Sequence, residues 1–353
     1  MRWTPEIVYV GDAALAGIIS MYSVKKIIFT TRNRKIYDTP DDTRKIHGAE
    51  IPTLGGIGIF IGYMLLACIF WPRQQPFMPY VLASTIILFF TGIYDDLMNM
   101  RPSKKLVAQL AAAFITVWLG DIRIDNLYGI AGIGAIPYWA GVGLTTIACT
   151  FFINVFNFVD GIDGLACVTA ILYSSVLGLL FTAMGFHLVA GIAFALAGAS
   201  AGLLVYNLAP AKIYMGDTGS MLLGFTIFAL AVLLLKMYGT HPAPGILHSP
   251  QAAITVIYAL LLLPMYDALR VFALRASRGI SPLRADRTHL HYYLLDAGCS
   301  HTQAVVLLLL CNIALVAIAW LMQDVTPLLN MLVVTVVATL MMGGVYVVRS
   351  GRR

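Results

Sequence analysis

The stretch FNFVDGIDGLA carries Asn157, Asp160 and Asp163 at intervals of three, with glycines between them. Carboxylate and amide oxygens are hard ligands of the kind that divalent cations such as Mg²⁺ take in proteins. Asp and Gly also favour turns, so a turn without a ligand is the alternative interpretation. The runs on both sides, Ile147–Phe156 and Leu165–Leu180, are strongly apolar. Three such groups in so apolar a region indicate a functional site.

Three further segments place acidic or imidazole groups at the ends of apolar runs. They are GIYDDLMNMRPSKKL with Asp95 and Asp96, YNLAPAKIYMGDTGS with Asp217, and SPLRADRTHLHYYLLDAG with Asp286, His289 and His291. Each alone has a simple structural explanation. The paired aspartates suit a helix end, the histidines suit a surface contact, and an N-cap before the eighth span could come from Asp217, Thr218 or Ser220. All four segments together, in a chain so poor in charge, predict one polar site.

Such a cluster suits a divalent cation bound to phosphates. Magnesium commonly takes one or two carboxylates and completes its shell with water and phosphate oxygens, and Asn157 and Asp217 are the candidate metal ligands. Basic groups nearby could neutralise phosphate charge; they are Lys105, Lys212, Arg284, Arg287 and the two histidines. Acids and bases on an apolar scaffold predict an enzyme that joins a soluble phosphorylated donor to a lipid phosphate.

The scaffold is predicted to be an all-α polytopic membrane protein. Of its 353 residues 59% are hydrophobic and 11% are charged, and the mean hydropathy is +0.84, whereas a soluble protein has about 25% charged residues. Apolar runs of helical length favour helices over a barrel. The eleven predicted spans are residues 6–26, 51–71, 78–97, 104–120, 138–157, 165–184, 187–207, 219–237, 251–273, 302–322 and 327–348.

Basic residues divide unevenly between alternate loops. The loops after odd-numbered spans and the C-terminal tail hold nineteen, and the other side holds only four. The positive-inside rule therefore predicts an outer N-terminus and a cytoplasmic C-terminus, and it explains much of the net charge of +6 without nucleic acid. Residues 121–137 are predicted to form a short hairpin or re-entrant piece on the outer side. The chain is expected to be one domain, 1–353, whose cytoplasmic cleft is built from loops at about 25–50, 95–105, 157–165, 207–218 and 274–301.

Five motifs in register resemble the polyprenyl-phosphate N-acetylhexosamine-1-phosphate transferase family (glycosyltransferase family 4). They are HGAEIPTLGG (47–56), YDDLMNMRPSKKLVAQ (94–109), NVFNFVDGIDGLA (154–166), MGDTGS (215–220) and SPLRADRTHLHYYLLDAG (281–298). The chain is most similar to the bacterial undecaprenyl-phosphate GlcNAc-1-phosphate transferases that start cell-envelope polysaccharides such as lipopolysaccharide and teichoic acid. The resemblance implies about 10–11 transmembrane helices, the bacterial cytoplasmic membrane, Mg²⁺ or Mn²⁺, release of UMP, and an assembly that is often a homodimer.

The resemblance also implies roles for individual residues. Asp217 would be a metal ligand and Asn157 a second one, and Asp95 and Asp96 would lie beside the acceptor phosphate, with Asp160 close to the pyrophosphate and metal. Either Asp95 or Asp96 is expected to be a positioning group or weak general base, with a covalent aspartyl-phosphate as the alternative. The candidate substrate-binding residues are His47, Lys105, Asn154, Asp163, Lys212, Arg284, Asp286, Arg287, His289 and His291.

The predicted reaction is transfer of a sugar 1-phosphate, most simply GlcNAc 1-phosphate, from a UDP-sugar to undecaprenyl phosphate. Other UDP-N-acetylhexosamines and UDP-MurNAc-pentapeptide are alternative donors. The last position of the family's HxHH pattern is Tyr292 here, a difference that concerns the identity of the sugar rather than the reaction. The triple histidine of the MurNAc-pentapeptide branch is absent. A secondary transporter is the alternative of another class. The span interiors are nearly free of charge, however, with Asp12 and Asp267 as the main exceptions, and Asp267 could pair with Arg270 one turn on.

Overall fold

The computed structural model describes residues 5–34, 51–69, 75–241, 245–279 and 287–350, with side chains from Tyr9 onward. Of the described residues, 79% are helical. Its elements are α1 (Pro5–Arg34), α2 (Gly56–Ile69), α3 (Met78–Met98), α4 (Pro102–Phe114), the π-helical η1 (Ile115–Leu119), β1 (Asn126–Ile130), β2 (Ile133–Ala135), α5 (Tyr138–Val159), α6 (Leu165–Ala183), α7 (His187–Asn207), α8 (Gly216–Thr240), α9 (Pro250–Ser277), α10 (Leu290–Asp296), α11 (His301–Leu321) and α12 (Pro327–Ser350). Each predicted span falls on a helix, with α4 and η1 together forming the fourth.

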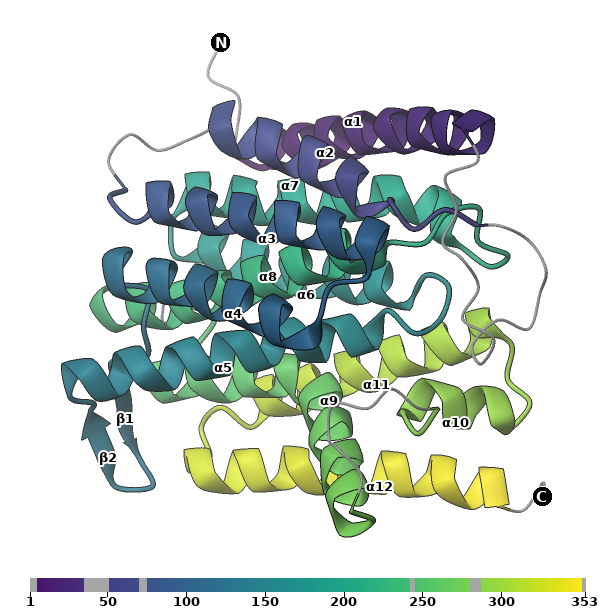
Figure 1. Cartoon of the computed structure of the whole chain (residues 1–353). Coiled ribbons are helices and arrows are strands. Elements are labelled where there is room, and N and C mark those ends of the chain that lie inside the picture. The colour runs from purple at the N-terminus through teal and green to yellow at the C-terminus, as the bar shows by residue number, and fades with distance from the viewer. Residues whose placement is uncertain (1–4, 35–50, 70–74, 242–244, 280–286, 351–353) are drawn as a thin grey trace. The chain divides into compact units, whose positions relative to one another are not determined.

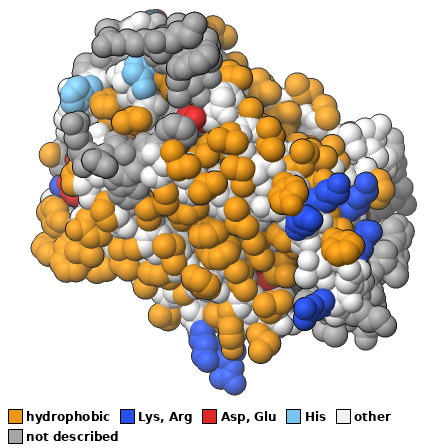
Figure 2. Space-filling view, turned by 90° about the horizontal axis from the view of Figure 1, so that it is seen from above, with side chains coloured by type: hydrophobic (Ala, Val, Ile, Leu, Met, Phe, Trp, Pro, Cys, Tyr) orange, Lys and Arg blue, Asp and Glu red, His pale blue; other side chains and the backbone are white. Residues whose placement is uncertain are grey.

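The helices are those of a polytopic membrane protein. Within the described residues, nine are long and apolar enough to cross a membrane, which confirms the predicted class. Two predicted spans correspond to shorter helices, α2 with 14 residues and α4 with 13, so the count of eleven stays a prediction, as does the orientation. Figure 2 shows a face covered mainly by hydrophobic side chains, with Lys and Arg at its margins. On α1, exposed Ile18 and Tyr22 precede exposed Lys25 and Lys26, as in a span that ends at a charged interface.

The first of two compact units comprises Met1–Ile122 and Leu144–Leu230. Within it α1 lies along α2 and α7, and α6 packs on α7 (Figure 1). Small residues allow these backbones to approach. A Cβ on Gly17 would lie 3.0 Å from the Gly198 carbonyl oxygen, and one on Gly202 would lie 2.8 Å from the Ser20 side chain. Close backbone packing is favoured in lipid, where apolar helices gain nothing from leaving water.

The first half of α8 forms the centre of this unit. Its residues from Met221 to Ile227 are buried. A Cβ on Gly92 of α3 would lie 2.6 Å from the backbone nitrogen of Thr218, and one on Gly224 would lie 2.9 Å from the Phe156 side chain of α5. The helices α3 and α5 therefore both pack closely against α8.

A tight link places the end of α3 beside the start of α4. Asn99 ends α3 in the left-handed conformation, with φ of 49°, which asparagine tolerates better than most residues. Three residues later α4 begins with Pro102 at its first position, where a missing N–H costs nothing. The acids at the end of α3 and the lysines at the start of α4 are thus brought together.

The second unit comprises Arg123–Gly143 and Ala231–Arg353. In it β1 and β2 pair antiparallel, which confirms the hairpin expected within 121–137. The helix α11 begins with a capping box between Ser300 and Gln303 and packs with α9 and α12. The sequence did not predict α10, because seven residues are too few for a helical hydrophobic period to be recognised.

Candidate active site

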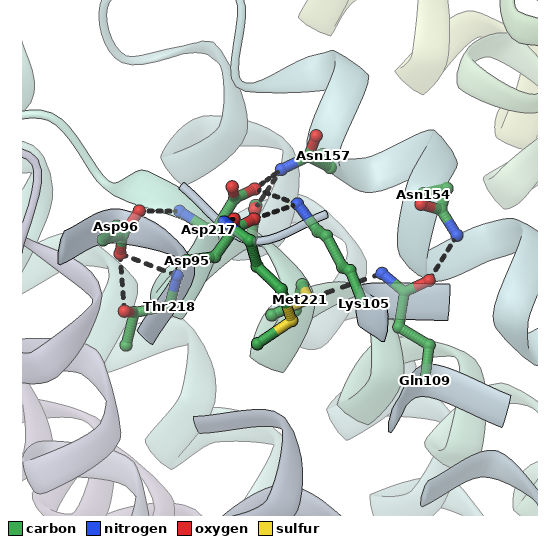
Figure 3. Close-up of polar contacts among 11 residues, drawn as sticks. Asp95, Asp96, Lys105, Gln109, Asn154, Asn157, Asp217, Thr218 and Met221 are labelled. Atoms are coloured by element: carbon green, nitrogen blue, oxygen red, sulfur yellow. Dashed lines mark hydrogen bonds and ion pairs between the residues drawn. The ribbon is translucent and has the colours of Figure 1, made fainter. Parts of the chain in front are cut away.

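Four of the predicted site residues contact one another through their side chains in the first unit, where the ends of α3 and α5 meet the starts of α4 and α8 (Figure 3). Lys105 Nζ lies 2.9 Å from Asp95 Oδ2 and 2.8 Å from Asp217 Oδ1. Asn157 Nδ2 donates to Asp217 Oδ1 and, at 2.9 Å, to Ser220 Oγ. These residues come from four helices, so the contact depends on the fold as a whole.

The two neighbouring aspartates have different surroundings. Asp95 pairs with Lys105 and accepts a hydrogen bond from the Met100 backbone N–H at 2.7 Å. Asp96 turns to the N-terminus of α8. It accepts from the backbone N–H of Asp217 at 2.7 Å, the backbone N–H of Thr218 at 3.0 Å and Thr218 Oγ1 at 2.6 Å. Asp96 therefore caps α8 from another helix, so the idea that Asp217, Thr218 or Ser220 supplies the N-cap is wrong.

The segment before α8 is held by the IPTLGG motif. Tyr214 N–H donates to Pro52 at 2.8 Å, Gly55 N–H donates to Tyr214 at 3.0 Å, and Gly56 N–H donates to Met215 at 2.8 Å, each to a backbone carbonyl. Gly216 follows with φ of +74°, a conformation that suits glycine. The short backbone ladder and the Asp96 cap together fix where α8 starts, and hence where Asp217 lies.

The DGIDG loop is fixed by a residue that the sequence did not single out. Asn207, which is buried at the end of α7, accepts from Gly164 N–H at 3.0 Å and donates from Nδ2 to the Ile213 carbonyl at 2.9 Å. Asp163 Oδ2 accepts from the Ala211 N–H at 3.1 Å. The loop that carries Asp160 and Asp163 is thereby joined to the segment that leads into α8. The sequence signal was a polar amide in an otherwise apolar span.

Asp160 lies in a region of accumulated negative charge. Burial removes water from the Asp160 carboxyl group, and the carboxylates of Asp217 and Asp96 repel its negative charge. The pKa of Asp160 is therefore raised well above its ordinary value. Desolvation and the nearby charges of Asp163 and Asp160 also raise the pKa of the Tyr214 phenol. Both shifts have the same causes, which are burial first and the negative charge around the start of α8 second.

Asn154 links α5 to α4, the helices that carry Asn157 and Lys105. Its Nδ2 donates to Gln109 Oε1 at 2.7 Å and to the Thr150 carbonyl at 2.8 Å. The buried Gln109 in turn lies with its Nε2 3.4 Å from Met221 Sδ. Because Gln109 and Asn154 lie one turn from Lys105 and Asn157, this link holds α4 and α5 in register at the site. The substrate contact predicted for Asn154 is untested, and Gln109 was missed by the sequence analysis.

The donor set suits a hard divalent cation. No three His, Cys, Asp or Glu side chains are grouped as a metal site in the described part of the chain. Magnesium does not need such a group, because it takes one or two carboxylates and fills its shell with water and phosphate oxygens. The oxygens gathered here belong to carboxylates, an amide and a hydroxyl, and Asp95, Asp160 and Asp217 outnumber the neighbouring cation Lys105. The residues therefore fit Mg²⁺.

The remaining predicted residues lie elsewhere in the chain. Lys212 is exposed in the segment before α8. His289 and His291 are buried in the second unit, where Arg287 is exposed with its guanidinium 5.2 Å from the centre of the Tyr292 ring. Asp267 pairs with Arg270, as expected. His47, Arg284 and Asp286 lie outside the described residues.

Comparison with known proteins gives consistent matches. The family model described as glycosyl transferase family 4 matches residues 78–235, a range that includes the contacting residues of the first unit. The decaprenyl-phosphate N-acetylglucosaminephosphotransferase of Mycobacterium leprae is 30% identical over 327 residues, covering 85% of this chain and 81% of its own. The same enzyme of Mycolicibacterium smegmatis is 34% identical over 291 residues, covering 76% and 70%. An undecaprenyl-phosphate alpha-N-acetylglucosaminyl 1-phosphate transferase of Escherichia coli is 30% identical over 315 residues, covering 85% and 81%.

Proposed function

The chain belongs to glycosyl transferase family 4, and we propose that it transfers GlcNAc 1-phosphate from UDP-GlcNAc to a polyprenyl phosphate, most simply undecaprenyl phosphate. It is a multi-pass protein of the bacterial cytoplasmic membrane. The products are polyprenyl-diphospho-GlcNAc, the first membrane intermediate of an envelope polysaccharide, and UMP. The homodimer implied by the resemblance stays a prediction.

The observation that carries the proposal is the cluster of Asp95, Lys105, Asn157 and Asp217. It combines a cation with hard oxygen ligands at the ends of membrane helices. Such a site suits phosphates, because a lysine neutralises their charge and carboxylates favour a bound divalent cation. Its position at the ends of apolar spans suits an acceptor whose phosphate lies at the membrane surface and whose prenyl chain stays in the bilayer.

In the reaction, an oxygen of the lipid phosphate attacks the β-phosphorus of UDP-GlcNAc, and the bond from that phosphorus to the bridging oxygen of the α-phosphate breaks. The bridging oxygen leaves with UMP, and the sugar keeps its phosphate. Such transfers need positioning and charge neutralisation more than a strong base. The acceptor phosphate is already largely ionised near neutral pH, because its second pKa is about 6.

The residues of the cluster have separate roles in this reaction. Lys105 neutralises phosphate charge, and Asp95, held by Lys105 and the Met100 N–H, positions the acceptor. Asp217 would hold Mg²⁺ together with the carbonyl oxygen of Asn157, whose Nδ2 is bonded to Asp217. Bound Mg²⁺, or Mn²⁺ in its place, supplies neutralisation of the diphosphate charge. Asp96 serves by fixing the start of α8.

The test is UMP release by purified protein with undecaprenyl phosphate and a panel of UDP-sugars, with Mg²⁺ or EDTA. Release that needs lipid, Mg²⁺ and UDP-GlcNAc, and that is lost in Asp217→Ala but kept in the control Asp324→Ala, would support the proposal. Asp324 is exposed in the second unit and pairs only with His248 among the described ion pairs. Release from a different UDP-sugar alone would support the proposed type of reaction and refute UDP-GlcNAc as the donor. No UMP from any donor, with folded protein, would overturn the transferase and favour transport.

A further inference from the structure

A set of polar contacts inside the first unit joins three of the helices that carry the site. Asn154 Nδ2 of α5 donates to Gln109 Oε1 of α4 at 2.7 Å, and Gln109 Nε2 lies 3.4 Å from Met221 Sδ of α8 (Figure 3). Gln109 and Met221 are both fully buried. These three residues, Gln109, Asn154 and Met221, are called the Gln109 layer below.

Each member of the Gln109 layer lies one helical turn from a site residue on the same helix. Residues three or four positions apart lie on the same face of a helix. The pairs of layer residue and site residue are Gln109 and Lys105 on α4, Asn154 and Asn157 on α5, and Met221 and Asp217 on α8. A shift of any of these helices at the layer therefore displaces the site residue that it carries.

The layer acts on the site through the helices and not by donating to a substrate. The Nδ2 group of Asn154 has two hydrogens, and its bonds go to Gln109 Oε1 and to the Thr150 carbonyl at 2.8 Å. Asn154 thus has no amide hydrogen left to donate. Gln109 is closed to a substrate because its side chain is fully buried.

The contact between Gln109 and Asn154 supplies direction more than stability. Hydrogen bonds between membrane helices add little net stability, because the unfolded chain in the bilayer also finds partners. Replacement of both partners by apolar groups of similar shape is often nearly neutral. A hydrogen bond nevertheless fixes a distance and an angle, which apolar contacts do not, and a misplacement of about 1 Å at a reacting centre lowers the rate about 100-fold.

We propose that Gln109 and Asn154 are positioning residues for the reaction. They hold α4 and α5 in one register against α8, so that Lys105 and Asn157 both meet Asp217. Lys105 then lies where it neutralises phosphate, and Asn157 lies where it joins Asp217 in holding Mg²⁺. The inference rests on the proposed function, since it takes phosphate and a divalent cation as the ligands of the site.

A second buried polar contact on α4 offers a matched control, because it lies farther from the site. Ser84 Oγ of α3 donates to the Ala112 carbonyl of α4 at 2.7 Å and accepts from Thr116 Oγ1 of η1 at 2.8 Å. Ser84 and Thr116 are both buried. Ala112 lies seven residues beyond Lys105, which is about 10 Å along a helix. The variant Ser84→Ala/Thr116→Val removes this contact and should leave the site unchanged.

The experiment measures unfolding in detergent micelles, the Kd of Mn²⁺ by electron paramagnetic resonance, and kcat of UMP release at saturating substrates. The variant Gln109→Met/Asn154→Leu keeps the side-chain shapes and should unfold like the wild type. Its kcat should fall and its Mn²⁺ Kd should rise, each by about 10–100-fold, as for other residues that orient metal ligands. The control Ser84→Ala/Thr116→Val should keep the wild-type kcat and Kd.

An exchange of the two amides tests whether their hydrogen bond carries the effect. Gln109→Asn alone shortens the α4 side chain and should lower kcat by at least about tenfold. Gln109→Asn/Asn154→Gln restores the combined length of the two side chains, so kcat should return to within about threefold of the wild type. This pair of variants also decides the role of the layer if Gln109→Met/Asn154→Leu does not fold.

Three results would overturn the inference. They are a wild-type kcat and Mn²⁺ Kd in folded Gln109→Met/Asn154→Leu, an equal loss of kcat in Ser84→Ala/Thr116→Val, and a wild-type kcat in Gln109→Asn. Failure of the proposed function is distinguishable from these. Wild-type protein that binds Mn²⁺ but releases no UMP from any donor would refute the transferase, while the Mn²⁺ Kd of the variants would still decide the role of the layer. Wild-type protein that neither binds Mn²⁺ nor releases UMP would refute both.

Discussion

Asparagine substitutions at the neighbouring residues Asp95 and Asp96 are expected to have different effects on the stability of the fold. Asp96→Asn should lower the stability of the fold, because both carboxylate oxygens accept hydrogen bonds at the start of α8. Asp95→Asn should leave stability nearly unchanged. Its carbonyl oxygen can still accept from the Met100 N–H, and Lys105 keeps its ion pair with Asp217.

The magnitude follows from what each asparagine loses. An asparagine at position 96 keeps one acceptor oxygen and turns an NH₂ group toward the donors at the start of α8. Loss of a cap costs about 0.5–2 kcal/mol, and loss of a negative charge at a helix N-terminus adds about 0.3–1 kcal/mol. Asp96→Asn should therefore cost about 2 kcal/mol. Asp95→Asn loses one ion pair but also relieves repulsion with Asp217, so its net change should stay within about 1 kcal/mol of zero.

The assay pairs unfolding in detergent micelles with UMP release. Asp95→Asn should keep the wild-type free energy of unfolding and lose activity by at least about 100-fold, as expected for a group that touches the reacting phosphate. Asp96→Asn should lose stability, and its activity should fall because Asp217 is displaced. If Asp96→Asn instead kept full stability and lost activity as completely as Asp95→Asn, Asp96 would be a reacting group and the assigned cap would be incidental.

Three further predictions concern the same site. Lys105→Met removes both ion pairs that neutralise Asp95 and Asp217, so UMP release should fall by at least about 100-fold; a fall of less than about tenfold would show that Lys105 does not meet phosphate. Asn207→Ala removes an acceptor and a donor that hold the DGIDG loop and should cost about 1–3 kcal/mol in unfolding free energy, whereas unchanged stability would mean that this link is unimportant. The pKa of Asp160 is raised in the fold, so its contribution to stability is greatest below its ordinary value of 3.8 and is lost as pH rises through the folded value. In EDTA, Asp160→Asn should therefore be more stable than the wild type at neutral pH, with the difference vanishing in acid, and a less stable variant at pH 7 would contradict the charge crowding.

The helices and the contacting residues of the first unit were predictable from the sequence for separate reasons. Apolar runs locate the spans because a bilayer demands their length. Grouping the polar span ends on one side then predicted that Asp95, Lys105, Asn157 and Asp217 belong to one site, and the structure places them in contact.

The division of work between Asp95 and Asp96 was not predictable. Successive residues on a helix point about 100° apart, and which of the two faces α8 depends on how the helices pack. Asn207 and Gln109 were missed because one amide in an apolar span indicates a polar contact but not its partners, which come from other parts of the fold. Asp267 was noticed as an acid inside a span, but its bond to His289 joins residues 22 positions apart and needed the fold to be revealed.

The central claim is that the sugar moves together with its phosphate. The most direct measurement uses UDP-GlcNAc radiolabelled at the β-phosphorus, incubated with the protein, Mg²⁺ and undecaprenyl phosphate, followed by extraction of the lipid. The account predicts that the label enters the lipid fraction in step with release of unlabelled UMP, and that neither occurs with Asp217→Ala. Label that remained in the nucleotide as UDP, while the sugar reached the lipid, would contradict it.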